Sequence, residues 1–176
     1  AELAPPAPPG PSISRADMQQ LLLDVHGVYT SFLTMTLADR DGVVIATSQR
    51  VDNVPAAWPE FHGSAIWDRD YFRHAMSEPG VQLSGVFQGR GFGDDLLVAV
   101  SRAVQVDGQA GYVVQGAIPV AVLMNRVQSR VRTSDICLAV VDAVGQVVGS
   151  TAPERWPSLS EAPAHWFGAA SQPGVV

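Results

Sequence analysis

Basic residues are few in this chain, and one kind is missing altogether. The 176 residues contain no lysine, and 11 arginines stand against 17 acidic residues, which gives a formal net charge of −6. Nucleic acids and anionic membrane surfaces are bound through dense positive charge. An acidic, lysine-free chain therefore argues against both as partners. Only 16% of the residues are charged, so glycine, proline and small polar residues must form much of the surface.

Cysteine and histidine are scarce as well. The single cysteine, Cys137, excludes an intramolecular disulfide and a thiolate metal cage. Its apolar neighbours, residues 136–141, predict a buried and unreactive thiol. The four histidines show no ligand spacing, so neither a metal site nor a cofactor is expected. No nucleophile elbow supports Ser-His-Asp catalysis, and we expect no catalytic residues.

Long apolar runs are also missing. The longest, Tyr112 to Met124, is interrupted by Gln115, Gly116 and Pro119 and is too short to span a bilayer. Residues 1–12 are rich in proline, lack the apolar centre of a signal peptide and predict a flexible linker or tail. These features fit either a soluble protein or a segment that lies between membrane anchors.

What the chain does contain is an alternation of helical and strand patterns. Ser14 followed by Asp17 is a helix-start pattern, and Asp41-Gly42 favours a tight hairpin turn. Pro79-Gly80 ends any helix that precedes it. The predicted elements are a helix over 14–32, strands over 32–37 and 43–48, a helix over 67–76, strands over 81–88, 96–106 and 110–118, and a helix over 119–131.

This order predicts an α+β fold, a PAS-like five-stranded antiparallel sheet with a long N-terminal helix and flanking helices. The N-terminal helix either covers the sheet or pairs with a second copy in a homodimer. Residues 37–48 (LADRDGVVIATS) and 140–151 (VVDAVGQVVGST) share one pattern: strand, acidic turn with glycine, strand. We therefore predict one lobe over 13–132, and the start of a second, incomplete lobe or a C-terminal extension over 133–176.

Short motifs within the first predicted lobe follow one another in a characteristic order. They are Asp68-Arg69-Asp70-Tyr71-Phe72, SGVFQGR at 84–90, Ser101-Arg102, and DGQAGYVV at 107–114. In this order and spacing, over about residues 18–131, the chain resembles the double-Cache sensor domains. Members of that family lie outside the membrane in bacterial histidine kinases, diguanylate cyclases and chemoreceptors.

The resemblance implies a periplasmic ligand-sensing domain that is not itself an enzyme. It would pass a conformational change to a cytoplasmic output domain and would meet the membrane only through anchors outside these residues. In the family, the ligand pocket lies between the sheet and the helix and loops above it. By resemblance, the ligand-binding residues are Arg69, Tyr71, Phe72, Ser84, Phe87, Ser101 and Ala117. An ion pair of Arg69 with a nearby carboxylate, and core packing of the two aromatics, are the structural alternatives.

The predicted site residues also indicate a class of ligand. A cation beside aromatic rings suits a small carboxylate. Amino-acid-binding members hold the ligand ammonium with an acidic residue after the last strand's glycine, where this chain has Ala117. The resemblance thus favours an organic acid over an amino acid, or a lobe that binds nothing. A protein-interaction or dimerisation module is the alternative function, and a soluble enzyme with an unrecognised site is a third.

Overall fold

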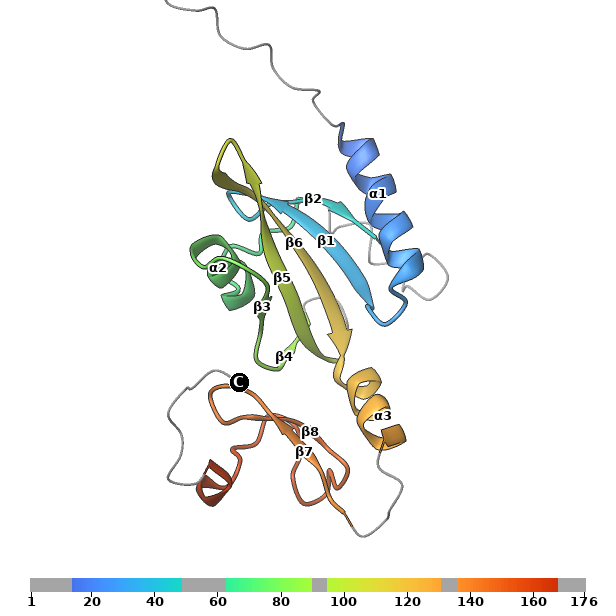
Figure 1. Ribbon diagram of the computed structural model, residues 1–176, viewed down its shortest axis with the longest axis vertical. Helices are drawn as coiled ribbons and strands as arrows, with labels where there is room; N and C mark the ends of the chain where they lie inside the picture. Colours follow the sequence, from blue (N-terminus) through green and yellow to red (C-terminus); the bar gives the residue numbers. More distant parts are fainter. Residues whose placement is uncertain (1–13, 49–62, 90–94, 131–135, 168–176) are drawn as a thin grey trace, which may run out of the picture.

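The computed structural model describes residues 14–48, 63–89, 95–130 and 136–167 (Figure 1). The predicted linker at 1–12 lies outside these residues. The elements are α1 (Arg15–Val28), β1 (Thr34–Asp39), β2 (Val44–Thr47), α2 (Asp70–Ser77), β3 (Gln82–Leu83), β4 (Phe87–Gln88), β5 (Leu96–Val106), β6 (Gln109–Pro119), α3 (Val120–Arg130), β7 (Ala139–Val141), β8 (Val147–Ser150) and a 3-10 helix (Ala164–Phe167).

The main sheet is antiparallel and has the order β2-β1-β6-β5-β3, with β4 also paired to β5. The α+β fold predicted from the sequence is confirmed. One predicted strand, 81–88, is in fact two short strands on the same edge of β5. They are separated at Ser84, whose hydroxyl donates to Gly85 O and accepts from the amide of Ala99. This local hydrogen bonding interrupts the ladder, so the sheet has six strands in five positions.

Helix α1 covers one face of the sheet. Ser14 caps it through a capping box with Asp17, as the sequence predicted. The helix ends at Val28, four residues earlier than predicted, and Phe32 instead reaches the sheet from the following loop. Leu22 packs on Met35 and Ala46 and is 7% exposed. The prediction that α1 packs on the sheet is therefore confirmed.

Helix α2 covers the opposite face (Figure 1). Its side chains Tyr71, Phe72 and Ala75 are buried against Ala99 and Val113 of the two central strands. The helix ends at Ser77, before Pro79-Gly80, as expected. The predicted site motif is thus fixed to the middle of the sheet.

The C-terminal hairpin, β7 and β8, forms a second small sheet next to α3. Val148 of β8 packs with Met124 and Val120 of α3 and with Val98 of the main sheet. Cys137, predicted to be buried, is exposed, because it precedes β7 instead of lying within the strand.

The two similar sequence segments adopt the same hydrogen-bonded turn. Asp39 Oδ1 accepts from the amides of Asp41 and Val43 at 3.0 and 2.9 Å. Asp142 Oδ1 accepts from the amides of Val144 and Gln146 at 3.1 and 2.8 Å. Each turn also holds a glycine with positive φ, +76° at Gly42 and +86° at Gly145. The two turns are thus alike in structure, while the internal duplication and the division at residue 132 stay predictions.

Candidate ligand-binding site

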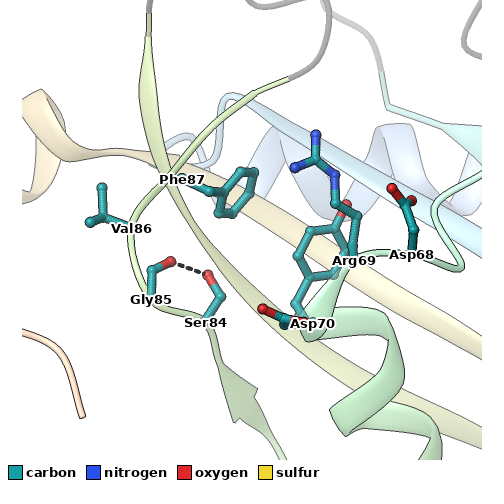
Figure 2. Close-up of a pocket in the computed structure, with 8 residues that line it drawn as sticks. Asp68, Arg69, Asp70, Ser84, Gly85, Val86 and Phe87 are labelled. Atoms are coloured by element: carbon teal, nitrogen blue, oxygen red, sulfur yellow. Dashed lines mark hydrogen bonds between the residues drawn. The ribbon is translucent and has the colours of Figure 1, made fainter. Parts of the chain in front are cut away.

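A cavity of about 200 Å³ lies between the start of α2 and the segment that joins β3 to β4 (Figure 2). Among the described residues, its lining comes from two short stretches of chain. The lining residues are Asp68, Arg69, Asp70, Tyr71, Ser84, Gly85, Val86 and Phe87. We call Ser84–Phe87 the wall segment.

Arg69 supplies the positive charge of the cavity. It is the residue before the first turn of α2, is half-buried, and its Cζ lies 5.4 Å from the centre of the Phe87 ring. A guanidinium over an aromatic face is attracted by the ring's quadrupole. Asp70 is paired with Arg73 and not with Arg69. Among the described residues, Arg69 makes no ion pair and its guanidinium donates no hydrogen bond, so this cation can still bind an anion.

Two aromatic rings form the apolar side of the cavity. The rings of Tyr71 and Phe87 lie 5.5 Å apart at an interplanar angle of 33°. Tyr71 is 8% exposed, and its backbone carbonyl accepts from Ser101 Oγ at 2.9 Å. That hydrogen bond fixes the start of α2 on β5. The cation and both rings therefore belong to the lining of one cavity.

The wall segment is held to β5 by one backbone hydrogen bond and one side-chain hydrogen bond. Ser84 N donates to Ala99 O at 2.9 Å, and Ala99 N donates to Ser84 Oγ at 2.8 Å. The hydroxyl of Ser84 in turn donates to Gly85 O at 2.7 Å (Figure 2). The Ser84 side chain thus shapes the wall.

Four of the seven predicted site residues line the cavity together: Arg69, Tyr71, Ser84 and Phe87. The other three lie nearby but outside its lining. Phe72 is in the core beneath α2, Ser101 binds the Tyr71 carbonyl, and Ala117 is buried on β6 opposite Ala99. Asp68, Asp70, Gly85 and Val86 were not predicted, although each adjoins a predicted residue in sequence.

The carboxylates near the cavity do not form a metal site in the part of the chain that the structure describes. No group of three or more His, Cys, Asp or Glu side chains could hold an ion there. The lining combines one cation, Arg69, with the carboxylates of Asp68 and Asp70, two aromatic rings and backbone groups, and Arg69 is the group in it that suits noncovalent binding of a small anion.

Comparison with known proteins gives the fold a context. No family model and no curated protein matches the chain. The ligand-binding domain of the Pseudomonas fluorescens chemoreceptor CtaA, in complex with L-isoleucine, is 19% identical with a TM-score of 0.62, over 84% of this chain and 56% of that one. The sensor domain of the V. cholerae histidine kinase DctB is 17% identical with a TM-score of 0.61, over 81% and 50%.

The ligand-binding domain of the Campylobacter jejuni chemoreceptor Tlp3, in complex with 4-methylisoleucine, gives 19% identity and a TM-score of 0.62, over 84% of this chain and 55% of that one. The chain shares its fold with these three domains. This agrees with the resemblance found in the sequence motifs. The chain spans about half the length of these sensor domains. Among the helices in the described residues, none has the length and apolar character needed to cross a membrane.

Proposed function

We propose that the chain is the ligand-sensing part of a bacterial membrane receptor, located in the periplasm, and that it binds a small organic acid without catalysing a reaction. The observation that carries this proposal is Arg69, a half-buried guanidinium that lines a cavity and has no ion pair among the described residues. The structural neighbours, which are ligand-binding or sensor domains of chemoreceptors and a histidine kinase, support it.

The ligand class follows from charge and size. A charge removed from water is costly unless it is paired, and a carboxylate matches the two-pronged guanidinium. The cavity of about 200 Å³ is smaller than the roughly 300–1,000 Å³ typical of drug-sized ligands. By the sequence resemblance, Ala117, which lies outside the lining, stands where amino-acid-binding members of the resembled family carry an acidic side chain for the ligand ammonium. A compact carboxylate without an amino group fits these features best.

The wall segment offers a route by which binding could be transmitted. Val86 lines the cavity and also packs with Met124 of α3 and Val148 of the C-terminal hairpin. A ligand that shifts the wall segment would therefore change the packing of α3. Such a ligand would favour one of two arrangements of the lobe, and the flanking segments would carry that bias to a cytoplasmic output domain.

Helix α1 supports a homodimer as the assembly state. Leu21 and Val28, seven residues apart on the same side of the helix, are 59% and 75% exposed. This exposed apolar pair is also the specific observation in favour of the alternative function, a dimerisation module without a small-molecule ligand. Sedimentation of the protein over a range of concentrations measures self-association, which both the sensor and the dimerisation module require. Binding of a small-molecule ligand distinguishes the two functions, because only the sensor requires it.

A thermal-shift experiment tests the proposal. We expect at least one acid from a panel of mono- and dicarboxylates to raise the melting temperature saturably. At a concentration of 100 times Kd the gain is about 2.7 kcal/mol, or roughly 5–11 °C for a protein of this size. Arg69→Ala should abolish the shift. Arg102→Ala is the matched control, because that arginine is exposed on β5 next to the buried Ser101 and does not line the cavity.

Two outcomes would contradict the proposal. One is a panel in which no carboxylate stabilises the protein. The other is a shift of equal size in the wild type and in Arg69→Ala. Either result, together with concentration-dependent self-association, would favour the dimerisation module.

A further inference from the structure

One oxygen of the Asp142 carboxylate is buried without a hydrogen-bond partner. Asp142 Oδ1 accepts from the amides of Val144 and Gln146 at 3.1 and 2.8 Å, which fixes the carboxylate in its turn. Oδ2 accepts no hydrogen bond, and within the described part of the chain it is the one buried side-chain N or O atom in this state. An unpaired buried acceptor is costly, and more so when the group is charged, so this oxygen requires an explanation.

The turn alone does not account for the burial of Oδ2. The equivalent turn residue, Asp39, accepts from two amides in the same way, yet it has no buried oxygen without a partner. Asp142 differs because its Oδ2 faces the wall segment: a Cβ atom at Gly85 would lie 2.7 Å from that oxygen. Gly85 lines the cavity. An unpaired acceptor of the C-terminal hairpin therefore lies directly against the wall of the candidate site.

The wall segment has a donor without a partner at the same place. The amides of Gly85 and Val86 donate no hydrogen bond to the described residues, whereas the Ser84 amide donates to Ala99 O. By covalent geometry, Gly85 N lies within about 5 Å of Asp142 Oδ2. Donor and acceptor are thus adjacent but not aligned, and Gly85 has no side chain to hinder a rotation of its backbone.

A hydrogen bond on the cavity side holds Gly85 in its observed conformation. The Ser84 hydroxyl donates to Gly85 O at 2.7 Å (Figure 2). Ser84 and Arg69 line the same cavity, and a carboxylate is a stronger acceptor for a hydroxyl than a neutral carbonyl is. A carboxylate bound in the cavity would therefore take the Ser84 hydroxyl from Gly85 O and leave the Gly85 backbone able to turn.

We propose that Asp142 is a positioning residue of the cavity, which accepts from the Gly85 amide when a small carboxylate is bound. This inference rests on the proposed function, in which Arg69 binds that carboxylate. The ligand competes for the Ser84 hydroxyl, Gly85 turns, and its N–H donates to Asp142 Oδ2. The new bond pairs the buried oxygen only in the liganded state, so it contributes to affinity and ties the wall segment to the C-terminal hairpin.

Calorimetric titration with three probes, propionate, pyruvate and succinate, tests this role. Asp142→Asn keeps an oxygen for the two turn amides but replaces Oδ2 with an N–H donor. We expect this variant to bind the probe that the wild type binds, but about 10-fold more weakly. Asp39→Asn is the matched control, because it makes the same change in the equivalent turn, whose aspartate does not line the cavity. Its affinity should equal that of the wild type.

Two further measurements distinguish positioning from a purely structural role. Without a probe, Asp142→Asn should melt no lower than Asp39→Asn, because it also removes an unpaired charged oxygen from a buried place. A purely structural role would give a lower melting temperature. In the wild type, a saturating probe should slow hydrogen exchange of the Gly85 amide about 10-fold, because a hydrogen-bonded amide exchanges only when its bond opens. This last measurement carries the test if Asp142→Asn does not fold.

The outcomes separate this inference from the proposed function. A probe that binds in an Arg69-dependent way, with equal affinity for the wild type and Asp142→Asn, overturns the role of Asp142 and leaves the proposed function standing. Equal weakening in Asp142→Asn and Asp39→Asn, or a Gly85 amide whose exchange does not respond to the bound probe, also overturns this inference alone. If no probe and no acid of the panel binds in an Arg69-dependent way, both proposals fail.

Discussion

Gly85 lies where the cavity wall meets the C-terminal hairpin, and replacing it with alanine should force the two apart. A Cβ atom at Gly85 would lie 2.7 Å from Oδ2 of Asp142, which is 0.7 Å short of the 3.4 Å at which ordinary contact begins. The carboxylate cannot swing away easily, because its Oδ1 accepts from the amides of Val144 and Gln146. Overpacking of this kind costs about 1–3 kcal/mol. We therefore expect Gly85→Ala to lower the melting temperature by roughly 2–12 °C.

Urea unfolding followed by circular dichroism measures this cost. Gly27→Ala is the matched control, because a Cβ there meets no atom within 4 Å and alanine in a helix should stabilise by about 0.5–1 kcal/mol. Asp142→Ala removes the opposing oxygen, so adding Gly85→Ala to that variant should cost little stability. The unfolding free energies of the two single variants and the double variant should therefore show a coupling energy of about 1–3 kcal/mol. The reasoning would be refuted if Gly85→Ala were as stable as the wild type. It would also be refuted if the losses of the two single variants added up to that of the double variant within about 0.5 kcal/mol.

Two further predictions concern the packing of α1 on the sheet. Gly116→Ala would place a Cβ 2.5 Å from the Phe32 ring. We expect this variant to lower the unfolding free energy by about 1–3 kcal/mol in a urea titration. As a check, Gly116→Ala should cost no stability when it is added to Phe32→Ala, which removes the ring. His26 is 2% exposed; its Nε2 lies 2.8 Å from Phe32 O, and its Nδ1 lies 2.9 Å from both the carbonyl and the hydroxyl oxygen of Ser48. His26→Ala should cost about 2–4 kcal/mol, and a loss below about 1 kcal/mol would contradict the assigned hydrogen bonds.

Local signals in the sequence were sufficient for much of the fold. The strand predicted over 96–106 is β5, Leu96–Val106, and the cap at Ser14 is observed. Both depend on neighbours in sequence: alternating apolar residues bounded by turn residues, and a serine with an acidic residue three positions later. The break at Ser84-Gly85 could not be predicted, because it depends on hydrogen bonds to Ala99, fifteen residues away.

The candidate site was likewise predictable from the sequence only in part. Arg69, Tyr71, Ser84 and Phe87 belong to short motifs, and the structure brings all four to one cavity. Gln115 was noted only because it interrupts an apolar run. Its burial depends on register, since only the pairing of β6 with β1 and β5 shows that it joins other buried polar side chains, and it does not line the cavity.

In the hairpin of β7 and β8 (Figure 1), β8 pairs with one edge of β7, and the other edge pairs with no strand of the described residues. On β1, the corresponding edge is occupied by β6, whereas no strand in the described part of the chain pairs with that edge of β7. Unpaired backbone N–H and C=O groups are a template for an incoming strand. An extended polypeptide that adds to such an edge by β-augmentation is held by main-chain hydrogen bonds, which are almost independent of its own side chains.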